Sequence, residues 1–373
     1  MTDDMNAPEL GRDKLNNELA CTGCGAILQF KPGSTSLVCT YCGAENAIAQ
    51  STEIIEEIDY EKFIHEKLDK EEKVDIVAVR CNACGASITL DPNITSDQCP
   101  YCASNIVIKS GTTSSLLKPK SLIPFAVDRK KAAELFRNWI SGLWFAPSDL
   151  KRADIVNEKL NGIYVPYWTY DTNTQTWYTG QRGDYYYVNE TYTTTENNQT
   201  VTKTRQVRKT RWTPASGQVH NSFDDILIIA SHSLPIKHTE RLEPWNLGQL
   251  LPFNDKYLSG FRSESYQVDV TTGLNEAKAK MAPVIQTTVR RDIGGDEQQI
   301  ATMNTTYTDI TFKHILLPIW ISSYRFKDKV YRFLVNGQTG KIQGERPYSV
   351  LKIFLLILAI IAIIVAIVML TQK

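Results

Sequence analysis

The chain has 373 residues and 41 acidic and 41 basic side chains, so its formal net charge is zero. A neutral chain is not a general binder of polyanions, and any contact with nucleic acid or lipid headgroups has to rest on a local basic patch. The length allows two or three domains. Seven Trp and seventeen Tyr residues indicate a sizeable packed core.

Residues 1–20 are expected to form a flexible N-terminal segment. The chain begins MTDDMNAPEL, which lacks the basic and apolar regions of a signal peptide. We therefore expect the bulk of the protein to be cytosolic, where thiols stay reduced.

All eight cysteines belong to a four-cysteine motif that occurs twice, with the second copy sixty residues after the first. In each copy, two Cys-x-x-Cys pairs are separated by fourteen residues. Pairs at this spacing are typical of one tetrahedral metal site with four thiolate ligands. The predicted ligands are Cys21, Cys24, Cys39 and Cys42 in the first copy and Cys81, Cys84, Cys99 and Cys102 in the second.

Each copy predicts a zinc ribbon, at residues 21–50 and 81–110. In the first copy, Gly25 and Gly43 directly follow a cysteine pair, where the turn usually needs a positive φ. The predicted cofactors are two Zn²⁺ ions, with iron in a rubredoxin-like site as the alternative, because four thiolates accept either metal. Two disulfides per copy are a second alternative that requires an oxidising compartment. A closed four-cysteine site leaves no open coordination position, so we expect a structural metal and no metal-activated water.

The two copies share more than their cysteines, which indicates an internal duplication. The other identical positions, counted sixty residues apart, are Gly25/Gly85, Ala26/Ala86, Pro32/Pro92, Thr35/Thr95, Ser36/Ser96, Tyr41/Tyr101 and Ile48/Ile108. Ala103 replaces the glycine that follows the last cysteine of the first copy. Between the cysteine pairs the only cation is Lys31, which favours protein docking or a structural role over nucleic-acid binding.

Residues 51–79 are predicted to form a helical linker. Asp59 is the expected N-cap, and Tyr60, Phe63, Ile64 and Leu68 recur at helical spacing.

Residues 116–349 predict a largely antiparallel α+β body. Helices are expected at Lys130–Ile140, 147–160 and Thr271–Arg291, from the spacing of their apolar residues. The aromatic and Thr-rich stretch from Tyr164 to Thr213 predicts a long antiparallel hairpin or meander. Strands are expected again after Ala301, with a hairpin turn at Asn336-Gly337.

One strand of this hairpin carries a candidate anion-binding face made of Lys203, Arg205, Lys209 and Arg211. Such a face can bind phosphates or anionic lipid headgroups. The alternative is an exposed edge that charge keeps soluble.

The body contains none of the common catalytic or nucleotide-binding motifs that we searched for, and we therefore expect no enzyme activity. Its histidines are scattered, at His220, His232, His238 and His314, and are expected to be structural.

Residues 350–370 predict a transmembrane helix. Ile353 to Leu370 is an apolar run of eighteen residues without a polar side chain. As a helix the run is about 27 Å long, close to the hydrocarbon thickness of a bilayer. Arg346 and Lys352 precede it, which agrees with a cytosolic N-terminus. We expect a tail-anchored, single-pass protein of the cytoplasmic (inner) membrane with its body in the cytosol.

These features together resemble a bacterial family of membrane-anchored double zinc-ribbon proteins, often labelled by machine as similar to primosomal protein N' (replication factor Y). The resemblance rests on the two ribbons, the segments LIPF, GIYVPYWTY and VNGQTGK, and the C-terminal anchor. Relatives are similar to components of membrane-stress modules of the phage-shock and SPFH (stomatin-like) types. The resemblance implies a membrane adaptor with a membrane-associated protein partner. The alternative hypothesis is a membrane-tethered nucleic-acid-binding protein.

Overall fold

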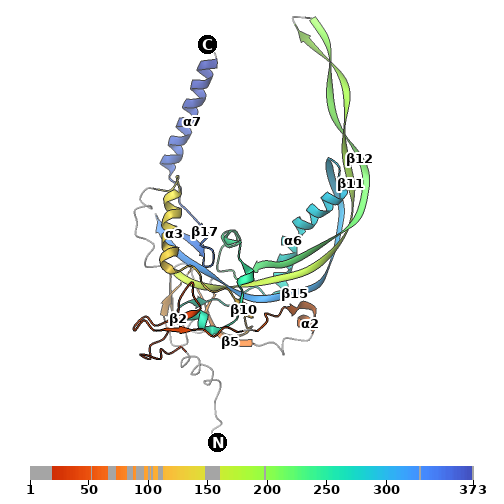
Figure 1. The fold of residues 1–373 in the computed structure, drawn as a ribbon. Helices are drawn as coiled ribbons and strands as arrows, with labels where there is room; N and C mark the ends of the chain where they lie inside the picture. The colour runs from red at the N-terminus through yellow and green to blue at the C-terminus, as the bar shows by residue number, and fades with distance from the viewer. Residues whose placement is uncertain are drawn as a thin grey trace.

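A computed structural model describes residues 19–51, 53–65, 73–81, 87–89, 96–99, 101, 104–107, 112–147, 160–196, 199–326 and 329–371 (Figure 1). The fold is α+β with mostly antiparallel sheets, a cysteine cluster near the N-terminus and one long apolar helix at the C-terminus, as the sequence predicts. The expected N-terminal flexible segment lies outside the described residues as far as residue 18.

Three unusually long strands dominate the body. They are β11 (Asn161–Glu196), β12 (Gln199–Ile229) and β15 (Glu297–Phe326), and β11 lies between the other two in antiparallel register. The order along the sheet is β12-β11-β15-β10-β13, where β10 is Ser121–Leu122 and β13 is Leu251–Pro252. The predicted long hairpin is therefore confirmed as β11 and β12.

The base of this sheet is covered on both faces. Residues 163–170 of β11 are all buried, with alternate side chains in different hydrophobic clusters. A run of apolar and aromatic side chains without polar alternation is the pattern of a strand that is buried on both sides.

Helix α6 (Val270–Ile293) packs on the concave side of the sheet (Figure 1). The Asp269 side chain caps it by accepting from Thr272 N, and the chain leaves it at Gly294 with a φ of 67°. Its buried residues recur at three- and four-residue spacing, which confirms the predicted helix; they include Leu274, Ala277, Met281, Ile285 and Val289.

Helix α3 (Arg129–Gly142) confirms the predicted helix at 130–140 and is capped by Asp128. Its Phe136 ring stacks on Phe333 of β16 (Lys329–Asn336), with centroids 3.6 Å apart. The predicted turn after Asn336 is also confirmed, since Gly340 has a φ of 79° and the chain returns as β17 (Ile342–Gly344). The helix predicted at 147–160 falls mostly on residues 148–159, outside the described part of the chain.

Short elements fill the remainder of the body. They are α5 (Ile236–Thr239), η1 (Glu240–Leu242), η2 (Leu247–Gln249), η3 (Asp255–Leu258) and β14 (Arg262–Ser263).

The linker at 51–79 is not wholly helical, so that prediction is wrong in part. Strand β4 (Ile58–Asp59) pairs with β15, and helix α2 (Tyr60–His65) follows with Asp59 as its cap. Strand β5 (Lys73–Arg80) then pairs with β6 (Ser87–Thr89) and β9 (Thr112–Leu117). Ile76 to Val79 is a short continuous apolar run rich in β-branched residues, which is consistent with a strand, and pairing at both edges stabilises it.

The C-terminal helix α7 (Val350–Thr371) projects from the body, and none of its residues is buried within the chain (Figure 1). It is long and apolar enough to cross a membrane, at about 33 Å. Its start is fixed to the body, because Lys352 Nζ donates to Ala146 O at 2.7 Å and Ser349 N donates to Phe145 O at 2.7 Å.

Two arginines near the centre of α7 should abolish stable membrane insertion. The variant Leu358→Arg/Ile361→Arg places two charges there, each of which costs about 2.5–3.5 kcal/mol on insertion scales. After alkaline carbonate extraction the variant should leave the membrane pellet. The apolar control Leu358→Ile/Ile361→Leu should stay in it. If the arginine variant pellets like the unchanged protein, α7 is not a transmembrane helix.

Candidate metal centre

The first cysteine motif folds as a small three-stranded sheet with two knuckles. Its strands are β1 (Gln29–Phe30), β2 (Ser36–Val38) and β3 (Glu45–Ala47), in the order β1-β2-β3. Each knuckle closes with a backbone hydrogen bond, from Gly25 N to Cys21 O at 2.8 Å and from Gly43 N to Cys39 O at 2.9 Å. Both glycines have positive φ, 73° and 75°, as predicted.

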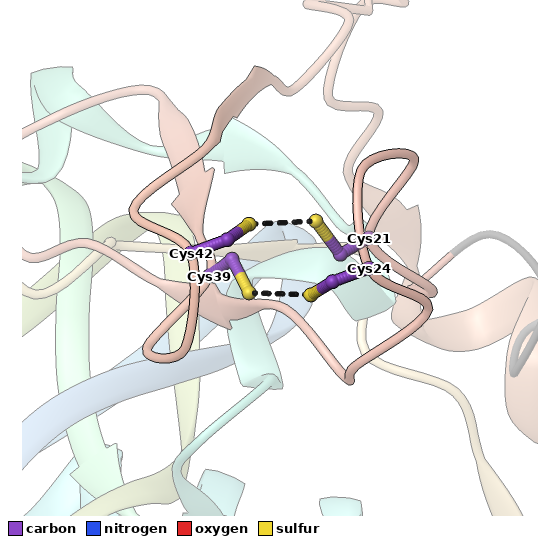
Figure 2. A group of neighbouring side chains, drawn as sticks. All are labelled: Cys21, Cys24, Cys39 and Cys42. Atoms are coloured by element: carbon purple, nitrogen blue, oxygen red, sulfur yellow. Dashed lines mark hydrogen bonds between the residues drawn. The ribbon is translucent and has the colours of Figure 1, made fainter.

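The knuckles bring four sulfur atoms together (Figure 2). Cys21 Sγ lies 3.5 Å from Cys42 Sγ, Cys24 Sγ lies 3.5 Å from Cys39 Sγ, and all four ligand atoms lie within 4.8 Å of one another. No disulfide joins these four cysteines. Sulfurs about 2.3 Å from a tetrahedral metal are about 3.8 Å apart, so this cluster fits a Zn²⁺ or iron ion.

The backbone around the sulfurs favours thiolates in part. Hydrogen bonds from the N–H groups of Cys42 and Tyr41 lower the pKa of Cys39 to about 6. At Cys42 the N–H of Ala44 acts in the same direction, but the neighbouring thiols of Cys21, Cys39 and Cys24 outweigh it and raise the pKa to about 12. Four sulfurs this close cannot all be anionic without a cation between them, and a metal ion supplies that charge.

The second motif is described only in part. Cys81 and Cys99 are buried, whereas Cys84 and Cys102 lie outside the described residues. Strands β7 (Ser96–Gln98) and β8 (Asn105–Val107) pair as Ser96↔Val107 and Gln98↔Asn105, sixty residues on from the β2–β3 pairs Ser36↔Ala47 and Val38↔Glu45. The knuckle bond from Cys39 N to Ala44 O, 2.9 Å, also has its counterpart from Cys99 N to Ser104 O, 2.8 Å.

The first ribbon is packed against the body. Phe30 N donates to Ser259 O at 3.0 Å and Gly33 N donates to Phe125 O at 2.8 Å. The Phe30 ring meets Tyr257 edge-on with centroids 5.1 Å apart. Cys21 and Cys39 belong to the same hydrophobic cluster as α3 and β16, so the metal site shares a core with the body.

The two knuckle tyrosines, Tyr41 and Tyr101, occupy equivalent positions in the two cysteine motifs but have different environments. Tyr41 is 84% exposed, whereas Tyr101 is 1% exposed. Tyr101 OH donates to Glu264 Oε2 at 2.7 Å, and Glu264 is itself buried. Ser231 Oγ and Gln267 Nε2 donate to the other oxygen of Glu264 at 2.9 and 2.8 Å. Nothing in the sequence around Glu264 marks it as a buried carboxylate.

The candidate anion-binding residues lie where the sequence places them, at alternate positions of β12 and so on one face. Glu190 on β11 forms ion pairs with Lys209, at 2.9 Å, and with Arg205, at 3.9 Å.

The histidines of the body do not form a cluster. His314 is buried, burial lowers its pKa to about 4, and its Nδ1 lies 3.0 Å from Leu117 O.

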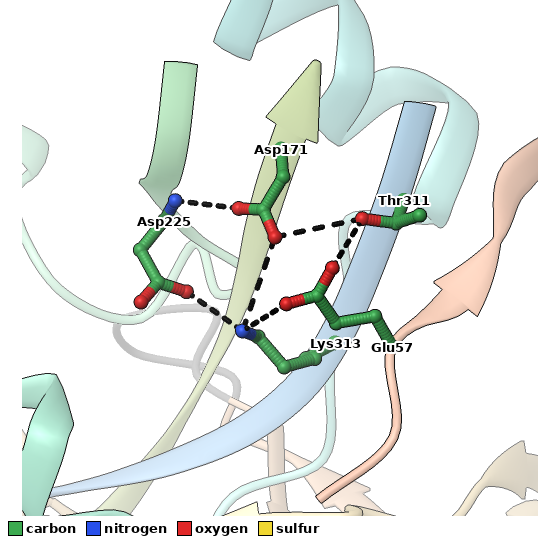
Figure 3. Close-up of polar contacts among 5 residues, drawn as sticks. All are labelled: Glu57, Asp171, Asp225, Thr311 and Lys313. Carbon is green, nitrogen blue, oxygen red and sulfur yellow. Dashed lines mark hydrogen bonds and ion pairs between the residues drawn. The ribbon is translucent and has the colours of Figure 1, made fainter. Parts of the chain in front are cut away.

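A group of carboxylates around Lys313 joins the linker to three strands (Figure 3). Lys313 Nζ lies 2.9 Å from Asp225, 3.0 Å from Glu57 and 4.0 Å from Asp171. Asp171, Asp224 and Asp225 are close enough to hold a metal ion, but the Lys313 ammonium already supplies the positive charge. This cluster therefore has a structural role: it fixes Glu57 of the linker to the sheet.

The protons in this cluster are unevenly shared. Burial and the nearby Glu57 carboxylate raise the pKa of Asp171 to about 7. Burial opposes ionisation of Glu57, but hydrogen bonds with Asp171 and Thr311 and the ion pair with Lys313 lower its pKa to about 2.

The chain was compared with known proteins. No family model and no solved structure matches it. A curated protein of Bacillus subtilis strain 168, the uncharacterized protein YdjG, is 24% identical over 330 residues, which cover 88% of this chain and 89% of that protein. The similarity thus runs through nearly the whole length of both chains.

Removing ligands from the first ribbon should release its metal. In the variant Cys39→Ser/Cys42→Ser, the metal content measured by mass spectrometry should fall by one equivalent, and residues 21–50 should become sensitive to protease. Structural zinc contributes about 10–16 kcal/mol to the folding of small zinc domains, so the ribbon should not fold without it. The knuckle control Thr22→Ser should keep metal and resistance. Unchanged metal content in the cysteine variant would contradict the assignment.

Asp171 should make the protein less stable as pH rises. The folded state keeps this proton up to a pKa of about 7. The unfolded chain releases it near pH 4, so its stabilising contribution is complete below about pH 4 and is lost towards pH 7. Asp171→Asn removes this dependence, and the free energy of unfolding of the variant relative to the unchanged protein should increase between pH 5 and 8.

The control for this experiment is Glu53→Gln, since Glu53 is an exposed carboxylate of the same linker as Glu57 and lies outside the cluster. Its effect on the free energy of unfolding should be the same at both pH values. Chemical denaturation in detergent measures all three proteins, and a pH-independent difference for Asp171→Asn contradicts the assignment.

Proposed function

We propose that the protein is a non-enzymatic, membrane-anchored adaptor. In this proposal its zinc ribbons and α+β body present protein-docking surfaces on the cytosolic side of the cytoplasmic membrane, and α7 holds them there.

The observation that carries the proposal is the contrast between the knuckle tyrosines. Tyr101 inserts into the body and donates to the buried carboxylate of Glu264. Tyr41, at the equivalent position, is exposed, and Ile27 near the other knuckle of the same ribbon is also exposed. We infer that the first knuckle offers to a partner the kind of contact that the second makes within the chain. Exposed aromatic and aliphatic side chains on a rigid support are typical anchors of protein interfaces.

The chemistry of the first ribbon supports a structural metal. Four thiolates complete the coordination of one tetrahedral ion, so no position is left for substrate or water. The metal then stiffens the knuckle that carries Tyr41. We extend this to a second Zn²⁺ held by Cys81, Cys84, Cys99 and Cys102, and the equivalent strand register of β7 and β8 supports that extension.

The membrane orientation rests on charge. Arg346 and Lys352 lie at the N-terminal end of α7, and such residues favour the cytosolic side. The exposed Trp144 lies beside this end, since Lys352 Nζ is 3.4 Å from Trp144 O, and an interfacial aromatic suits the headgroup layer. The resemblance to membrane-stress families suggests a membrane-stress complex as the assembly in which the adaptor works.

The adaptor proposal predicts that the exposed knuckle selects a partner. The full-length protein, isolated from mildly cross-linked and detergent-solubilised membranes, should retain at least one discrete membrane protein. Ile27→Ser/Tyr41→Ala should reduce its recovery roughly tenfold or more, because the loss of two interface anchors costs several kcal/mol. Quantitative mass spectrometry compares the two recoveries.

The matched control is Ile54→Ser, because Ile54 is 86% exposed and Ile27 is 65% exposed. The control should recover the same partner as the unchanged protein, and all three proteins should contain the same amount of metal. No consistent partner, or equal recovery with the knuckle variant, would sink the proposal.

A further inference from the structure

The linker between the two cysteine motifs is attached to the long sheet by short elements. We define residues 53–65 as the docked linker. Its strand β4 has two residues and its helix α2 has six. The Phe63 ring of α2 meets Phe312 of β15 edge-on, with centroids 5.0 Å apart. Neither a strand nor a helix this short is stable by itself, so the docked linker depends on its side-chain contacts with the sheet.

Glu57 makes the polar contact of the docked linker. Its Oε1 accepts from Lys313 Nζ at 3.0 Å and its Oε2 accepts from Thr311 Oγ1 at 2.6 Å (Figure 3). Asp171 reaches the same two donors, since its Oδ2 lies 3.5 Å from Thr311 Oγ1 and 4.0 Å from Lys313 Nζ. The carboxyl groups of Glu57 and Asp171 therefore share one hydroxyl and one ammonium group.

Irregularities in the sheet bring further carboxyl groups to this point. The register of β11 shifts next to Asp171 against both of its neighbours, β12 and β15. An aspartate with positive φ lies at each shift, Asp225 at 52° in β12 and Asp309 at 53° in β15. Asp225 N donates to Asp171 Oδ1, and the exposed Asp309 accepts from Asn173 Nδ2 at 3.2 Å. Bulges redirect side chains and are frequent next to functional sites.

The cluster contains more acid than base. Among the described residues, Lys313 is the only cation that pairs with Glu57, Asp171 and Asp225. Three carboxylates and one ammonium have a net charge of −2 when all are ionised. Asp224 adds to this excess, because its carboxyl oxygen lies within 4.8 Å of those of Asp171 and Asp225. Carboxylates this close repel each other, so one of them favours its protonated form.

Asp171 is the group that keeps the proton. Its side chain is 16% exposed, against 28% for Asp225 and 37% for Glu57, so water stabilises its charged form least. Burial and the nearby Glu57 carboxylate raise the pKa of Asp171 to about 7.

Ionisation of Asp171 should act on Glu57 first. Asp171, Asp225 and Lys313 belong to the long strands β11, β12 and β15, whereas Glu57 precedes a strand of two residues. When a further anion appears beside the ammonium, the member with the weakest attachment moves. Glu57 is also the most exposed of the three carboxylates, so water can solvate it once it leaves.

We propose that this cluster is a proton-operated latch: protonated Asp171 lets Glu57 hold the docked linker on the sheet, and ionised Asp171 displaces it. The latch is closed at low pH and opens as pH rises, because the open state binds the proton of Asp171 less tightly. The docked linker joins the two cysteine motifs, so the latch controls how firmly the segment between them is attached to the body. The inference does not depend on the adaptor role.

Hydrogen–deuterium exchange of the full-length protein in nanodiscs measures the latch. The protection of residues 53–65, corrected for the intrinsic pH dependence of exchange, should fall about tenfold between pH 6 and pH 8.5. The closed latch keeps the proton over about one pH unit of this interval, and each unit is worth a factor of ten. The protection of α6 should stay the same. Equal protection of the docked linker at both pH values overturns the proposal.

Two variants separate the latch from a general effect of pH. Asp171→Asn replaces the titrating group by a neutral one of the same shape, so the docked linker should be equally protected at pH 6 and pH 8.5. Glu57→Gln removes the anion that Asp171 repels and should also abolish the difference between the two pH values, whatever its effect on the protection itself. The matched control Glu53→Gln, an exposed carboxylate of the linker outside the cluster, should keep the tenfold change. A tenfold change in both cluster variants overturns the proposal.

Discussion

The first ribbon depends on one constraint, which is that four sulfur atoms lie within 4.8 Å of one another. Thiolates at this distance repel each other, and a metal ion turns that repulsion into the strongest local stabilisation available to a segment of thirty residues. The strands β1, β2 and β3 are only two or three residues long. Strands this short are not stable by themselves, so their geometry depends on packing against the body and on the metal that we propose for the four sulfurs.

The two cysteine motifs contact the body differently. The first ribbon is fixed through Phe30 and Gly33, and its outer knuckle stays open. The second motif turns its knuckle tyrosine inward, to Glu264. The knuckle of the second motif thus packs within the chain, whereas the outer knuckle of the first is exposed, and this difference is the basis of the adaptor proposal. The long strands β11 and β12 add a second projection on the side of α7 (Figure 1).

Several parts of this structure follow from local sequence. The cysteine spacing predicted the first four-cysteine cluster and the positive φ of Gly25 and Gly43, because Cys21 to Gly43 spans only twenty-three residues. Helical periodicity predicted α3 and α6, and an unbroken apolar run predicted α7. Strand β5 was missed because residues 51–79 were predicted as one helical linker, whereas the strand is stabilised by pairing with β6 and β9.

Other parts could not be predicted from local pattern. Tyr41 and Tyr101 occupy the same position in their motifs, and the carboxylate that accepts from Tyr101, Glu264, lies 163 positions further along the chain. The Lys313 cluster likewise joins Glu57, Asp171 and Asp225 from three distant segments.

The most direct test of the adaptor account is photo-cross-linking in cells from a benzoylphenylalanine at position 41, with position 54 as the exposed control. The account predicts one discrete adduct with a membrane protein from position 41 and none from position 54, whereas no adduct, or the same adducts from both, would contradict it.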